Sequence, residues 1–234
     1  VYMTKKIIAV DLDGTLLNNE SKLSDFTKET IKKISEKGHH VIITTGRPYR
    51  MAKDFYRELE LHTPMINFNG SLTHLPGQTW EHEKCLTLDK KYLLDMVKRT
   101  EDIQADFIAG EYRKKFYITT PNEEIADPKL FGVENFRPEN QFKPERVTKD
   151  PNCILLQTRA EDKYALADEM NRFYQHQLAI NTWGGPLNIL ECTPKGVNKA
   201  FALEYLLNVM NRDKKDLIAF GDEHNDTEML AFAG

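Results

Sequence analysis

Short apolar runs alternate with amphipathic stretches in the first part of the chain. The runs occupy residues 7–10, 41–44 and 65–68. A continuous apolar run, rather than an alternating one, is typical of a strand buried in a parallel sheet. Residues 24–37 are predicted to form a helix that begins at Ser24 and stops at Gly38, and a second helix is predicted from Pro48 to residue 59. This alternation predicts a parallel sheet with right-handed crossovers.

The pattern loses this regularity after residue 70. A hairpin is predicted around Pro76-Gly77, and the following segment mixes strands with helices. The predicted strands are 105–109, 113–119, 153–158, 178–183 and 187–191, and the predicted helices are 89–102 and 160–175. Residues 120–150 are rich in Pro, Asn and charge and are predicted to be mostly loop. This mixed α+β segment is predicted to be an inserted domain.

The α/β alternation then resumes with a helix that is expected to begin at Thr193 or Pro194 and a buried strand at residues 216–220. The simplest domain organisation is therefore a discontinuous core with one insertion. The expected ranges are 1–83 and 189–234 for the core and 84–188 for the inserted domain.

Polar residues directly follow three of the predicted strands. They are Asp11 and Asp13, then Thr45 and Gly46, and finally Asp222, Asn225 and Asp226. Because ligands of open α/β sheets bind beyond the carboxyl ends of the strands, we expect these groups to meet at one edge. Three carboxylates there would raise one another's pKa values unless a cation such as Mg²⁺ neutralised them. The alternative interpretation of the first pair is an Asp-x-Asp-Gly turn without chemistry.

Composition narrows the possible partners and the compartment. The 234 residues carry a net charge of −4, which provides no basic surface for nucleic acid. No apolar run approaches the roughly 18 residues of a membrane span, and no signal peptide is visible, so no membrane partner is expected. Three scattered cysteines without metal-type spacing favour a reducing, cytoplasmic location. The sequence predicts neither a particular substrate nor an oligomeric state.

Four motifs in order resemble those of the haloacid dehalogenase superfamily, specifically its Cof-type subfamily of small-molecule phosphatases. They are Asp11-Leu12-Asp13-Gly14-Thr15, Thr45 in Ile-Thr-Thr-Gly-Arg, the lysine in Pro194-Lys195-Gly196-Val197-Asn198-Lys199, and Gly221-Asp222-Glu223-His224-Asn225-Asp226. The resemblance implies an α/β fold, with a Rossmann-like core and an inserted α+β cap domain. It also implies a further strand and helix beyond residue 234, so the C-terminal part of the core is expected to be missing.

The resemblance implies that Asp11 is the nucleophile that attacks phosphorus and forms an aspartyl-phosphate. Asp13 would protonate the leaving oxygen and then deprotonate the attacking water. Mg²⁺ would be held by Asp11, by the backbone carbonyl of Asp13 and by Asp222, with Asp226 supporting these ligands from behind.

The resemblance also implies a phosphate-binding group. Its members would be Thr45, the backbone N–H groups of Leu12 and Gly46, Asn225, and a lysine. Lys199 is favoured because it follows a Gly-Val-Asn stretch, and Lys195 is the alternative. Arg47 has two open interpretations, a contact to phosphate or cap and a structural role at a helix start. Asn69-Gly70 is either a turn at the mouth of the site or a generic turn.

We expect a Mg²⁺-dependent phosphatase of a small phosphorylated metabolite, with a sugar phosphate favoured. The first alternative is a phosphatase of a cofactor such as pyridoxal phosphate or flavin mononucleotide. The second alternative is a sensor that binds a phosphorylated ligand without turnover. Intact Asp11 and Asp13 favour an enzyme, because a binding protein needs no acid/base group.

Overall fold

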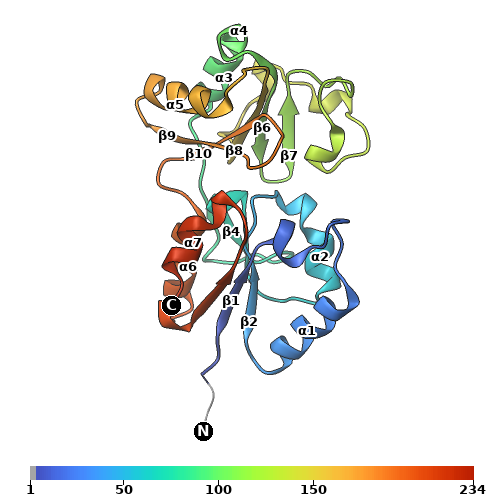
Figure 1. Ribbon diagram of the computed structural model, residues 1–234, viewed down its shortest axis with the longest axis vertical. Coiled ribbons are helices and arrows are strands. Elements are labelled where there is room, and N and C mark those ends of the chain that lie inside the picture. Colours follow the sequence, from blue (N-terminus) through green and yellow to red (C-terminus); the bar gives the residue numbers. More distant parts are fainter. Residues whose placement is uncertain (1–3) are drawn as a thin grey trace. The chain divides into compact units, whose positions relative to one another are not determined.

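The computed structural model describes residues 4–234, which form two compact units. The first unit contains residues 4–85 and 197–234, and the second is Leu86–Gly196 (Figure 1). The insertion was expected at residues 84–188, and the second unit ends later than this, at Gly196. The reason is that Ile189–Pro194 (β10) pairs with strands of the second unit, although this stretch was expected in the core. The roles of core and cap for the two units stay predictions.

A parallel sheet lies at the centre of the first unit. Its strands are β11 (Leu217–Phe220), β1 (Ile7–Val10) and β2 (His40–Ile43), in that order. Both neighbours run parallel to β1. A parallel bridge from Thr44 to Ile66 places β3 (Met65–Asn67) next to β2. β1 is therefore an interior strand, which matches its continuous apolar sequence.

Helices cover both faces of this sheet. Figure 1 shows α1 (Asp25–Glu36) and α2 (Lys53–Glu58) on one side and α6 (Lys199–Val209) and α7 (Thr227–Phe232) on the other. The side chains of β1 alternate between two buried clusters because successive residues of a strand point to opposite faces. The first cluster includes Val10, Val41, Ile43, Ile31 and Tyr56, and the second includes Ile7, Ala9, Ile42, Leu203 and Leu206.

The helix boundaries follow local capping chemistry. Ser24 caps α1 by accepting a hydrogen bond from the Thr27 N–H, as its position predicted. The helix expected to begin at Thr193 or Pro194 begins only at Lys199, where Asn198 is the N-cap. That prediction was wrong because the preceding residues belong to β10.

The second unit is an antiparallel sheet with helices packed on it. Its strand order is β7 (Lys115–Ile118), β6 (Ala105–Tyr112), β8 (Cys153–Thr158), β10 and β9 (Leu178–Thr182). The helices are α3 (Lys90–Lys98), α4 (Thr100–Ile103) and α5 (Lys163–Phe173). The predicted loop at residues 120–150 contains three single-turn 3₁₀ helices. This unit therefore has the α+β character that the sequence predicted.

A short antiparallel sheet and a tight turn complete the first unit. β3 pairs with β4 (Leu72–His74), which pairs with β5 (Lys84–Cys85). All three cysteines are free. Over residues 4–234, each helix is too short or too polar to span a bilayer.

Gly70 in the turn after β3 allows a close approach to the start of α6. Its φ is +113°, and a Cβ there would lie 2.3 Å from the carbonyl oxygen of Asn198. We expect Gly70→Ala to lower the free energy of unfolding by about 2–4 kcal/mol, because the new methyl group meets backbone as well as a strained φ. Urea denaturation measures this difference.

Gly77→Ala is the matched control for that substitution. Gly77 has a φ of +77°, and a Cβ there would meet nothing within 4 Å. Its replacement isolates the conformational cost of a positive φ, about 1 kcal/mol. Equal losses for both variants would show that the contact with Asn198 contributes nothing.

Candidate active site

Asp11 occupies the carboxyl end of the interior strand β1. Its backbone N–H donates to the carbonyl oxygen of Phe220 over 3.1 Å, so the β1–β11 ladder extends to this residue. Only 4% of Asp11 is exposed. The apolar sequence of β1 therefore places one carboxylate at the edge of the sheet where ligands of open α/β folds bind.

Lys199 joins Asp11 to Asp226. Its ammonium group donates to Asp11 Oδ1 over 3.0 Å and also to Asp226 Oδ1, and both Lys199 and Asp226 are fully buried. Lys199 is the first residue of α6, next to the N-cap Asn198. Lys195, the alternative lysine, is exposed and belongs to the second unit. The geometry therefore supports Lys199 as the lysine of the site.

Asp226 organises the loop that follows β11. Its Oδ2 accepts hydrogen bonds from the backbone N–H groups of Asp222 (3.0 Å) and Glu223 (3.1 Å). A Cβ on Gly221 would lie 2.5 Å from the Asp226 carboxyl carbon, so only glycine allows this close turn. Asp226 thus holds Asp222 in place, which fits the supporting role expected for it.

Burial raises the pKa of Asp11 to about 6, from an ordinary value of 3.8. Desolvation is the largest cause, Lys199 opposes it, and the Asp226 carboxylate reinforces it. Because one lysine is shared by two buried carboxylates, the negative charge of ionised Asp11 is under-compensated by positive charge. A further positive charge would be favourable at this position.

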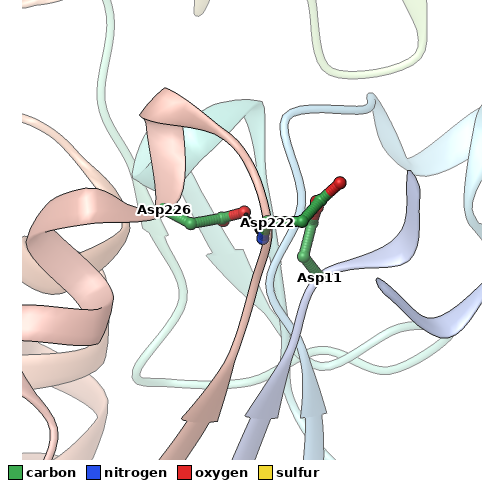
Figure 2. Close-up of side chains that lie close together, drawn as sticks. All are labelled: Asp11, Asp222 and Asp226. Carbon is green, nitrogen blue, oxygen red and sulfur yellow. Dashed lines mark hydrogen bonds between the residues drawn. The ribbon is translucent and has the colours of Figure 1, made fainter. Parts of the chain in front are cut away.

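Three carboxylates are close enough to surround a cation. One oxygen from each of Asp11, Asp222 and Asp226 lies within 4.8 Å of the others (Figure 2). Hard oxygen donors of this kind suit Mg²⁺, and the under-compensated charge of Asp11 fits the same ion. Because Asp226 already binds Lys199 and two backbone N–H groups, Asp11 and Asp222 are the better candidate ligands.

The turn after β1 is shaped around Asp222. Thr15 Oγ1 donates to Asp222 Oδ1 over 3.2 Å. Gly14 has a φ of +73°, and a Cβ there would lie 2.0 Å from Asp222 Oδ2. The glycine of the Asp-x-Asp-Gly segment is therefore needed both for its φ and for the approach of this carboxylate. Asp13, in the same turn, is exposed and pairs with Arg47.

Asn69 links candidate phosphate-binding residues that follow two different strands, Thr45 after β2 and Asn225 after β11. Its backbone N–H donates to the Thr45 carbonyl oxygen, and its Oδ1 accepts from Asn225 Nδ2, both over 3.0 Å. A Cβ on Gly46 would lie 3.0 Å from the Asn69 amide. The sequence left Asn69 between two interpretations. Its φ of +56°, which Asn tolerates better than most residues, allows this bridge.

Comparison with known proteins identifies the family. The family model described as haloacid dehalogenase-like hydrolase matches residues 8–234. The 5-amino-6-(5-phospho-D-ribitylamino)uracil phosphatase YitU of Bacillus subtilis (strain 168) is 32% identical over 233 residues, which cover 97% of this chain and 84% of that protein. The 5-amino-6-(5-phospho-D-ribitylamino)uracil phosphatase YcsE of the same organism is 27% identical over 229 residues, covering 98% of this chain and 81% of that protein.

A solved structure shows the same fold. A haloacid dehalogenase-like hydrolase from Bacteroides thetaiotaomicron superposes with a TM-score of 0.80 at 22% identity, covering 99% of this chain and 86% of that one. The family match and the relatives confirm the resemblance that the four motifs carried. The chain therefore belongs to the haloacid dehalogenase-like hydrolases and, within that family, to the phosphatases.

Proposed function

We propose that this phosphatase is Mg²⁺-dependent and hydrolyses a small phosphorylated metabolite through an aspartyl-phosphate on Asp11. The observation that carries this proposal is the position of Asp11, a buried carboxylate at the end of β1. It is fixed by Lys199 and lies within reach of Asp222. A nucleophile needs such fixation, because an oriented group removes much of the entropic part of the barrier.

Two proton transfers accompany the two displacements. Asp11 attacks phosphorus while the bond to the ester oxygen breaks, and Asp13 gives its proton to that oxygen as the alcohol leaves. Asp13 then takes a proton from water, whose oxygen attacks phosphorus while the bond to Asp11 breaks. Inorganic phosphate leaves, and both aspartates return to their starting states.

The proposed metal ligands are Asp11, Asp222 and the backbone carbonyl of Asp13. When bound, Mg²⁺ would neutralise negative charge, so that an anionic carboxylate and an anionic phosphate can approach each other. Asp226 would hold the Asp222 loop in place. One carboxylate oxygen of Asp11 lies within 4.8 Å of one of Asp222, which supports these two residues as ligands of a single ion.

The proposed phosphate-binding groups are Thr45, the backbone N–H groups of Leu12 and Gly46, Lys199 and Asn225. Lys199 would share its charge between Asp11 and the phosphate oxygens. Asn225 donates to Asn69, and Asn69 also packs against Gly46. Asn225 therefore lies at the same edge of the sheet as Gly46. This network supports their assignment to one anion site.

The proposed substrate class is a phosphorylated sugar or sugar alcohol. The two relatives from Bacillus subtilis are named as phosphatases of 5-amino-6-(5-phospho-D-ribitylamino)uracil, in which the phosphate sits on a ribityl chain. Flavin mononucleotide, the cofactor alternative, carries its phosphate on the same chain. The common feature is a primary alkyl phosphate on a polyol, which is the chemistry we propose that this enzyme recognises.

A substrate panel tests the proposed function. Inorganic phosphate release would be measured from sugar phosphates, the ribitylaminouracil phosphate, flavin mononucleotide and pyridoxal phosphate, with Mg²⁺ and with EDTA. We expect release from polyol phosphates that EDTA suppresses by at least about 100-fold and that added Mg²⁺ restores. Release that EDTA leaves unchanged would overturn the metal dependence. Ligand binding without any phosphate release would favour the sensor.

A further inference from the structure

Arg47 and Asp13 form a bidentate ion pair, and the mechanism above gives Arg47 no role. Arg47 Nε donates to Asp13 Oδ2 over 2.7 Å, and one terminal guanidinium nitrogen donates to Asp13 Oδ1 over 2.5 Å. The Asp13 side chain is 54% exposed, whereas that of Arg47 is 20% exposed. Across residues 4–234, both hydrogen bonds that the structure shows to this carboxylate come from Arg47. The ion pair therefore sets the direction of an otherwise solvated side chain.

Arg47 is itself held from several sides. Its backbone N–H donates to Thr45 Oγ1, and its carbonyl oxygen accepts from Asn67 Nδ2, both over 3.0 Å. The second terminal nitrogen donates to the carbonyl oxygen of Met51 over 3.2 Å, and the guanidinium lies 5.6 Å from the centre of the Phe55 ring. A planar fork anchored in this way offers Asp13 one preferred geometry.

We propose that Arg47 is a positioning residue that orients Asp13 for proton transfer to the leaving oxygen. This inference rests on the proposed function. The observed ion pair corresponds to the carboxylate that Asp13 becomes when it passes its proton to the departing oxygen as the ester bond breaks. Before that step one Asp13 oxygen carries the proton, and the other oxygen keeps its hydrogen bond from the guanidinium. A misplacement of about 1 Å in an acid/base group lowers the rate on the order of 100-fold, so such an anchor has a measurable effect.

The competing role for Arg47 is direct binding of the substrate phosphate. The geometry favours the positioning role, because three donors of the guanidinium are already engaged by Asp13 and Met51. The two roles predict different kinetics. Replacing a residue that acts through Asp13 lowers kcat/KM only for esters that need a proton on the leaving group, because kcat/KM does not include the later attack of water. Replacing a phosphate ligand lowers kcat/KM for all phosphate esters equally.

The test compares two classes of ester in Arg47→Met and Arg47→Lys. p-Nitrophenyl phosphate releases a stable anion and needs little help from an acid, whereas the best alkyl phosphate of the panel needs a proton on its leaving oxygen. We expect Arg47→Met to lower kcat/KM about 30- to 100-fold for the alkyl ester and by no more than about 3-fold for the aryl ester. Arg47→Lys keeps the positive charge but not the planar guanidinium, so its kcat/KM for the alkyl ester should lie between those of wild type and Arg47→Met.

A double-mutant cycle with Asp13→Asn provides the second readout. If Arg47 acts through Asp13, Arg47→Met should have almost no further effect on kcat/KM in the Asp13→Asn background. Arg57→Met is the matched control. Arg57 lies in α2, its side chain is 70% exposed, and it pairs with Asp54 at 3.9 Å, so activity should stay within about 2-fold.

Specific outcomes would overturn the inference. Equal losses on both esters, with a raised inhibition constant for inorganic phosphate, would assign Arg47 to phosphate binding instead. If the effects of Arg47→Met and Asp13→Asn on kcat/KM were fully additive, Arg47 would not act through Asp13, and the inference would also be overturned. Wild-type protein that releases no phosphate would instead overturn the proposed function on which the inference rests, so the two failures are distinguishable.

Discussion

Replacing Asp11 by Asn is expected to abolish phosphate release, with a fall in kcat of at least about 10⁴-fold. The amide has nearly the same shape as the carboxylate but cannot attack phosphorus, and it is a poor ligand for a divalent cation. The measurement is inorganic phosphate release from the best substrate of the panel under saturating Mg²⁺. Retained turnover would contradict the assignment of Asp11 as nucleophile.

The same variant should fold at least as stably as the wild type in the absence of metal. The folded-state pKa of Asp11, about 6, lies above its ordinary value of 3.8, so its contribution to stability is present below pH 4 and is lost as pH rises through about 6. Asn does not titrate, so the stability of Asp11→Asn relative to wild type should increase between these pH values. Urea denaturation in EDTA at pH 4 and pH 7 measures this. If Asp11→Asn were instead less stable than wild type at pH 7, a destabilised fold would explain the lost activity.

Replacing Lys199 by Met is expected to reduce both turnover and stability. The substitution leaves the buried carboxylates of Asp11 and Asp226 without their shared cation. Breaking a buried ion pair from one side lowers the free energy of unfolding by about 3–5 kcal/mol. The loss of a positive group from the anion site should lower kcat about 10²- to 10³-fold. Denaturant titration and the phosphate assay measure the two effects separately.

Two further variants separate the loss of turnover in Lys199→Met from its loss of stability. Lys195→Met removes the alternative lysine, which is exposed, and should leave activity and stability within about 2-fold and 0.5 kcal/mol of wild type. Lys199→Met combined with Asp226→Asn removes a buried negative charge together with the ammonium group. This double variant should recover part of the stability but none of the turnover. Wild-type activity in Lys199→Met, or its loss in Lys195→Met, would reverse the assignment.

Local patterns were sufficient for most elements of the first unit. The apolar run before Asp11 predicted a buried parallel strand, and Ser24 predicted the start of α1. Such signals depend only on neighbours within a few residues. The prediction was wrong where one stretch matched two patterns. Ile189–Pro194 was divided between a predicted hairpin and a predicted helix, and its pairing with β8 and β9 makes it one strand.

The candidate site was predicted as a set of residues rather than as an arrangement. The motifs identified Asp11, Asp13, Thr45, Asp222 and the lysine motif, and their catalytic roles stay predictions. The choice between Lys195 and Lys199 required the fold, because Lys199 meets Asp11 across 188 positions of sequence. The pairing of Arg47 with Asp13 also required the fold, since it depends on where β2 ends relative to the turn after β1.

The sequence by itself determined the family, the α/β alternation of the first unit and the residues at the carboxyl ends of its strands. These follow from hydrophobic period and turn chemistry, which are properties of short segments. Only the tertiary structure decided which charges meet. It brought Lys199 between Asp11 and Asp226, set Asp222 against Gly14, and joined Arg47 to Asp13. The physical reason is that Coulomb and desolvation energies depend on distance and burial, and packing sets both only after distant segments have come together.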